Sequence, residues 1–249
     1  MKKLLNPMSL PWVTLAAGAA GLVLRLWLLA SRADETGMLA PGVHPAAVLL
    51  WLLTAAMVAL LWLATDRLLE GAKYRFNFPP SLQSAIGCLL GGASILVTCI
   101  IELIVYSDTL NLLTCLLGFL SAAALVYVAY CRWKGLRMNI LFHGAVCLYL
   151  MLRLVGQYRH WSSDPQLLDY CFQLMATVCI MLSVYHRAAF DADSGNRRLY
   201  AVFHLGAVYF CCLSLVGSEN IVFYLGIGIW MFFDLCSLRP MPRRIQEDA

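Results

Sequence analysis

Apolar stretches of about twenty residues alternate with short polar connections along the whole chain. A helix needs about 20 predominantly apolar residues to cross a ~30 Å hydrocarbon core, so each stretch predicts one transmembrane helix. The eight predicted helices lie at 10–30, 46–66, 82–106, 110–131, 138–158, 166–187, 199–216 and 220–238. The pattern therefore predicts an all-α, polytopic integral membrane protein with eight transmembrane helices. Residues 1–249 form a single transmembrane domain.

Basic residues gather in every second connection, and the intervening connections are acidic. The basic blocks are Lys2 and Lys3; Arg67, Lys73 and Arg75; Arg132, Lys134 and Arg137; Arg187, Arg197 and Arg198; and Arg239, Arg243 and Arg244. Cytoplasmic loops of membrane proteins are enriched in Lys and Arg. We therefore interpret these residues as loop charges and expect both termini to be cytoplasmic.

Composition excludes a soluble domain and a nucleic-acid partner. The chain is 61% hydrophobic and 13% charged, which is far too apolar for a soluble protein of 249 residues. We interpret its net charge of +4 as a topology signal and a contact with anionic membrane lipid. The sequence has no N-x-[ST] sequon, which fits a bacterial inner membrane protein.

Two parts of the chain show a hint of internal duplication. The run Leu22-Val-Leu-Arg-Leu26 in the first predicted helix matches Leu150-Met-Leu-Arg-Leu154 in the fifth. Residues 1–135 and 136–249 could thus be two parallel four-helix repeats, a known construction of membrane carriers. The alternative is coincidence, because Leu-rich helices match one another easily.

Three charged residues are predicted at similar depth in the outer half of the bundle: Arg25, Glu102 and Arg153. A charge at the bilayer centre costs about 2.5–3.5 kcal/mol, so such residues are functional candidates. Gln157 and Gln173 could reach the same depth. Two arginines and one carboxylate leave one surplus positive charge, which an anionic group of a solute could satisfy. Alternatively, Glu102 pairs with one arginine while the other extends to the lipid headgroups.

A second polar set is predicted nearer the cytoplasm. His143, His204 and Asp234 lie on three different predicted helices and could form a proton relay. The alternative is that each side chain only satisfies a neighbouring polar group. The ten cysteines form no CxxC motif and no Cys/His pair at zinc spacing, so we expect no metal and no cofactor.

Two local patterns concern packing and docking. Gly87 and Gly91 form a GxxxG motif, which favours close helix packing, within the chain rather than between two chains. The basic loops 67–80 and 187–198 could contact headgroups or dock a partner protein.

The functional expectation is a protein that binds or transports a small solute with an anionic group, at Arg25, Glu102, Arg153, Gln157 and Gln173. The alternative is a non-catalytic subunit, sensor or assembly factor that docks a partner through its basic loops. A membrane enzyme acting on lipid ranks third, because the sequence has no hydrolase, nucleotide or dinucleotide motif.

Overall fold

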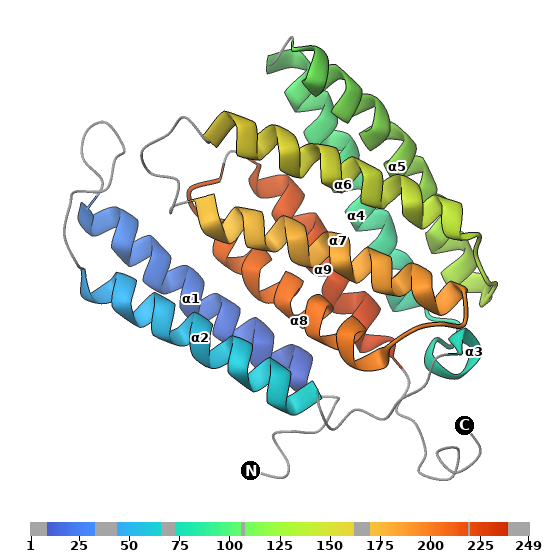
Figure 1. The fold of residues 1–249 in the computed structure, drawn as a ribbon, viewed down its shortest axis with the longest axis horizontal. Helices are drawn as coiled ribbons and strands as arrows, with labels where there is room; N and C mark the ends of the chain where they lie inside the picture. The colour runs from blue at the N-terminus through green and yellow to red at the C-terminus, as the bar shows by residue number, and fades with distance from the viewer. Residues whose placement is uncertain are drawn as a thin grey trace.

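The computed structural model describes residues 9–32, 44–65, 73–105, 108–161, 170–218 and 220–238, and these ranges are helical apart from turns and short connections. The helices are α1 (Leu10–Arg32), α2 (Pro45–Thr65), α3 (Tyr74–Asn77), α4 (Leu82–Val105), α5 (Thr109–Lys134), α6 (Ile140–Trp161), α7 (Cys171–Asp191), α8 (Arg197–Ser214) and α9 (Ile221–Cys236) (Figure 1). The expectations for Lys2, Lys3, Arg67 and the arginines after 238 concern residues outside these ranges.

The all-helical fold class is confirmed for the described residues, and every predicted stretch contains one helix of 16 residues or more. Six helices are long and apolar enough to cross a membrane: α1, α2, α4, α5, α6 and α7. Helix α9 is apolar but has 16 residues, and α8 has 18 residues and begins with two arginines. The count of eight crossings therefore stays a prediction.

The outward-facing surface of the long helices is apolar. Ile104 on α4 is 80% exposed and Leu141 on α6 is 76% exposed, and many other large apolar side chains face outward. A soluble monomer rarely exposes contiguous apolar surface of this extent. In a bilayer the same surface contacts lipid chains, so the fold is that of a multi-pass membrane protein.

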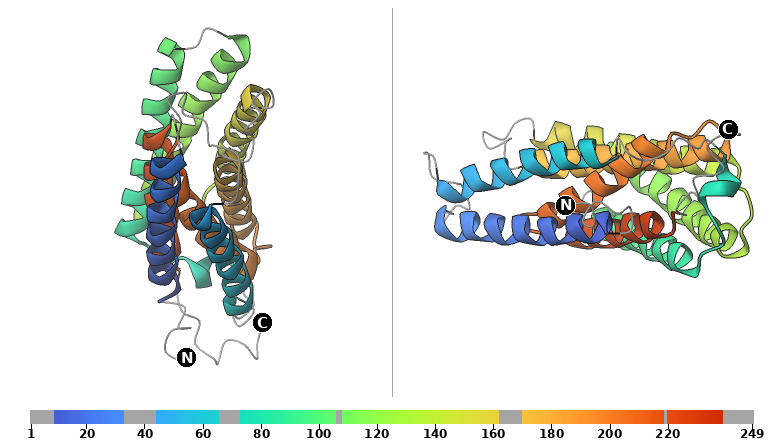
Figure 2. Two further views of the ribbon diagram at one scale, coloured as in Figure 1. Left: turned by 90° about the vertical axis from the view of Figure 1, so that its left-hand side faces the viewer. Right: turned by 90° about the horizontal axis from the view of Figure 1, so that it is seen from below.

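Helices α4 to α9 close into a ring. Each packs on its neighbour in chain order, and α9 packs on α4, which completes the circle. The hairpin of α1 and α2 lies outside this ring and packs mainly on α8 (Figure 1; Figure 2). The two polar clusters described below therefore lie inside a six-helix ring, with the α1–α2 hairpin, which carries Arg25, on one flank.

Small residues let α4 and α9 approach closely. A Cβ on Gly87 would lie 3.0 Å from Phe233, and one on Gly91 would lie 3.0 Å from Trp230. Both contacts are within the chain, so the prediction that the GxxxG motif serves internal packing is confirmed.

A short helix, which the apolar pattern did not predict, lies at one end of the ring. Residues 73–81, the α3 segment, carry Tyr74 and Phe78 into the bundle, where both are buried. Gly135 ends α5 with φ +70°, and its close contact with Pro80 fixes the segment against this helix end. We call this end of the bundle the α3 end and the opposite one the far end.

The two halves of the chain are not packed alike. Helix α7 packs along α8, whereas α2, its counterpart in the proposed repeat, packs along α1 and α8. The duplication of 1–135 and 136–249 remains a prediction.

Candidate functional site

Arg153 on α6 and Glu102 on α4 form a buried ion pair toward the far end of the ring. Arg153 Nη1 donates to Oε1 and Oε2 of Glu102 at 2.9 and 3.1 Å. The same nitrogen lies 3.3 Å from the hydroxyl of Tyr149, and the guanidinium stacks over the ring of Phe223 at 4.2 Å. The structure thus brings together two of the three charges expected at this depth.

One edge of this guanidinium is unused. Arg153 is 3% exposed, yet its Nε and Nη2 have no hydrogen-bond partner among the described residues. One turn further along α6, Gln157 donates to the hydroxyl of Tyr224 at 3.4 Å and leaves its own Oε1 without a partner. Buried polar groups are normally satisfied. Two donor atoms of Arg153 and one acceptor atom of Gln157 therefore lie one helical turn apart without hydrogen-bond partners.

Arg25 does not join this pair. Its Nη1 donates to the carbonyl oxygen of Leu213 at 2.7 Å, at the C-terminal end of α8, where a cation is favoured. Gln173 donates nearby to the carbonyl oxygen of Gly217 at 3.1 Å. The reason is packing, since α1 lies mainly against α2 and α8, whereas Glu102 and Arg153 are on α4 and α6. The surplus positive charge inferred from the sequence therefore does not arise at one site.

Asp234 on α9 is the centre of a second buried network, at the α3 end. Its Oδ1 accepts from Ser84 Oγ at 2.5 Å and from Arg132 Nη2 at 3.0 Å. Its Oδ2 accepts from the hydroxyl of Tyr200 at 2.9 Å and lies 3.6 Å from His204 Nε2. Four helices of the ring thus meet at one carboxylate.

A second arginine lies beside this network. The guanidinium of Arg187 on α7 stacks on Phe78 at 3.6 Å, and that of Arg132 approaches the same ring at 4.8 Å. Phe78 from the α3 segment therefore contacts two buried cations. Arg187 also lies 5.2 Å from the ring of Tyr74.

The three residues proposed as a proton relay are only partly brought together. His204 reaches Asp234, as expected, but His143 on α6 lies 3.6 Å from Oδ2 of Asp191 on α7. Asp191 directly precedes the basic loop, and its carbonyl accepts from Arg137. The relay set therefore divides between two carboxylates.

Sequence reasoning missed the arginines of this network, because it assigned them to loops. Arg132 is 2% exposed and Arg187 is 5% exposed, so their side chains are inside the bundle. One signal was present for Arg132. Gly135 is the left-handed residue that ends a helix, and taking it as the stop would have extended the predicted helix past Arg132.

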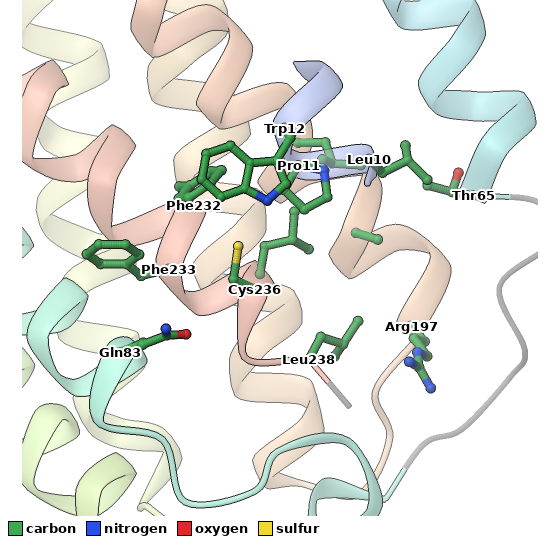
Figure 3. Close-up of a pocket in the computed structure, with 13 residues that line it drawn as sticks. Leu10, Pro11, Trp12, Thr65, Gln83, Arg197, Phe232, Phe233, Cys236 and Leu238 are labelled. Atoms are coloured by element: carbon green, nitrogen blue, oxygen red, sulfur yellow. The ribbon is translucent and has the colours of Figure 1, made fainter. Parts of the chain in front are cut away.

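A pocket of about 440 Å³ opens at the α3 end between α1, α8 and α9 (Figure 3). Its lining is mostly apolar, with Trp12 and Phe232 among it, and Arg197 supplies a polar edge. Several of the helix ends that line it adjoin residues outside the described ranges, so we assign no ligand to it.

The fold and the two buried clusters define a helical membrane protein with charged groups inside a closed ring of helices. Comparison of the chain with protein families, with characterised proteins and with solved structures finds no match.

Proposed function

We propose that this chain crosses a cell membrane eight times, with both termini in the cytoplasm, and binds and transports a small solute. The observation that carries the proposal is the free Nε and Nη2 edge of buried Arg153. That edge is a planar fork, and a carboxylate or a similar two-acceptor group matches it with two parallel hydrogen bonds. A bacterial inner membrane fits this proposal and remains part of it.

The charges around Arg153 indicate what kind of solute fits. Glu102 already balances Arg153, so a lone anion would leave one surplus negative charge in the bundle. The open Oε1 of Gln157 requires a donor. A small zwitterion of the amino-acid type has both groups, a carboxylate for Arg153 and an ammonium for Gln157. The anionic group expected from the sequence is thus retained as one part of a solute without net charge.

Arg153→Lys is expected to weaken binding of glycine, the smallest such zwitterion, by about tenfold or more. Lysine keeps the positive charge but cannot form the two parallel bonds, and charge-assisted bonds contribute about 1.5–3 kcal/mol each. Calorimetric titration of the purified protein in detergent measures the affinity, and glycine uptake into proteoliposomes measures transport.

Gly144→Ala is the matched control on the same helix, because nothing lies within 4 Å of the added methyl group. The control should bind glycine like the wild type. Equal affinity and equal uptake in wild type and Arg153→Lys would contradict the proposal.

The proposed topology makes a prediction about the two ends of α5, where Asp108 and Lys134 are both exposed. In intact cells a membrane-impermeant maleimide added outside should label Asp108→Cys. Lys134→Cys should be labelled only after permeabilisation. The wild-type chain, with ten native cysteines, supplies the background. The reverse pattern would place the termini outside, and labelling of both positions from one side would exclude a crossing by α5.

The alternative function is docking of a partner protein through basic residues at the α3 end. Among the residues whose side chains the structure describes, the exposed cations at this end are Lys73, Lys134 and Arg137. Arg197 is buried and Arg198 stacks over the ring of Trp62 at 4.4 Å, so neither is the simplest anchor for a partner. Loss of pull-down on replacing Lys134 and Arg137, with unchanged glycine binding, would favour this alternative.

A further inference from the structure

Arg187 is a buried cation whose charge is not matched by a hydrogen-bonded partner. Its described contacts are with the rings of Phe78 and Tyr74, and its Nη1 is fully buried without a hydrogen-bond partner. Removing a cation from water is costly unless hydrogen bonds replace its hydration. Aromatic stacking covers the faces of the guanidinium but does not use its N–H groups, so the buried Nη1 remains to be satisfied.

Asp191 presents the complementary group one turn further along α7. The residue is 4% exposed, and neither carboxylate oxygen accepts from another side chain within the described part of the chain, although the backbone N–H of Met138 approaches the carboxylate. His143 Nδ1, at 3.6 Å, is too distant for a good hydrogen bond and is itself without one. A buried donor and a buried acceptor group thus face the same region with their bonds open.

The neighbouring charges do not fill these requirements. Asp234 accepts from Arg132, Ser84 and Tyr200, so its two oxygens are already used. Arg137 donates to the carbonyl oxygen of Asp191 and pairs with Asp193, outside the buried region. Arg132, Arg187, Asp191 and Asp234 together form a neutral buried set. The open groups of Arg187 and Asp191 within it require a ligand with both an acceptor and a donor.

We propose that Arg187, Asp191 and His143 form a second ligand site, at the α3 end of the ring, for a small zwitterion. Its carboxylate meets Arg187, and its ammonium meets Asp191 and His143. The site is built from residues of α6 and α7 and is separate from Arg153. The second site is argued from its own residues. It rests on the proposed function only in that the same class of solute is assigned to both sites.

Apolar side chains separate the two sites. Val146, Leu150, Ile180 and Val184, on the same helices α6 and α7, are all fully buried between them. The α3 segment covers the second site, because Phe78 and Tyr74 lie against Arg187. A solute at the second site is therefore enclosed by the α3 segment on one side and by the apolar core on the other.

Calorimetric titration of the full-length protein in detergent with glycine tests the second site. In the Arg153→Lys background, which impairs the first site, glycine should still bind. Adding Asp191→Asn should weaken that remaining binding about tenfold or more, because a charge-assisted bond is lost. Arg187→Gln should do the same. Gly144→Ala, beside His143 in the chain but facing away, should change nothing.

Glycine betaine and acetate are the control ligands. Betaine has the charges of glycine but no N–H donor, and acetate has the carboxylate alone. Neither should bind at the second site. Asp191→Asn keeps the size of the side chain, so it tests the site even if Arg187→Gln fails to fold.

The outcomes separate the two proposals. Glycine binding that is lost in Arg153→Lys and unaffected by Asp191→Asn overturns the second site and leaves the proposed function standing. Binding that survives Arg153→Lys unchanged but is lost in Asp191→Asn supports the second site and overturns the first. No glycine binding in the wild type overturns the second site, and water molecules then bridge its polar groups.

Discussion

Asp234→Asn is expected to destabilise the folded protein by about 3–5 kcal/mol, the range for removing one partner of a buried ion pair. The amide keeps the shape of the side chain but cancels the charge that balances Arg132, which is 2% exposed. In the wild type, the hydroxyls of Ser84 and Tyr200 donate to the carboxylate. In the variant, one of them faces an N–H₂ group, which cannot accept. The result is a buried, uncompensated cation. Equilibrium unfolding in mixed detergent–SDS micelles measures the change.

Asp193→Asn is the matched control, because Asp193 pairs with Arg137 where both side chains are about half exposed. Such pairs contribute about 0–1 kcal/mol, so this variant should unfold nearly like the wild type. In Arg132→Gln/Asp234→Asn the charge imbalance disappears, and the loss should be smaller than the sum of the single losses. Equal effects of Asp234→Asn and Asp193→Asn would show that the network at Asp234 is hydrated.

Gly226→Ala is expected to destabilise the protein by about 1–3 kcal/mol through overpacking between α9 and α4. An added Cβ would overlap the side chain of Ser94 and lie 3.2 Å from the carbonyl oxygen of Leu90. Backbone atoms cannot move aside as a flexible side chain can, so the two helices must separate. The same unfolding measurement applies.

Gly144→Ala provides the opposite case, since its methyl group meets nothing within 4 Å. It should stabilise α6 by up to about 1 kcal/mol, the difference in helix propensity. Ser94→Gly combined with Gly226→Ala removes the overlapping atoms and should restore part of the lost stability. If both glycine variants behave alike, the close approach of α4 and α9 is not as the structure has it.

The helices could be predicted from the sequence because a run of apolar residues is a one-dimensional signal. Depth along a helix could be read in the same way, which is why Glu102 and Arg153 were placed together correctly. The neighbouring helix toward which a side chain points could not be predicted in this way. Arg25 has the expected depth, but α1 lies on the flank of the ring, so it meets α8 instead.

The network at Asp234 shows a different reason for incomplete prediction. The enrichment of Arg near cytoplasmic ends identifies the side of the membrane, but it does not distinguish a side chain in a loop from one that turns inward. Arg132 lies in the last turn of α5 and Arg187 about one turn before the end of α7, and both side chains are buried. Their partners come from α4, α9 and the α3 segment, which are distant in sequence.

Closure of the ring by its first and last helices has a consequence for biosynthesis. Arg132 precedes Asp234 by 102 residues, and Glu102 precedes Arg153 by 51. Because the chain is made from its N-terminus, α5 leaves the ribosome before α9, which carries Asp234, does. Arg132 therefore enters the membrane region before its partner, the carboxylate of Asp234, is present. A nascent chain that stops before α9 keeps this arginine unneutralised, which marks it as incomplete.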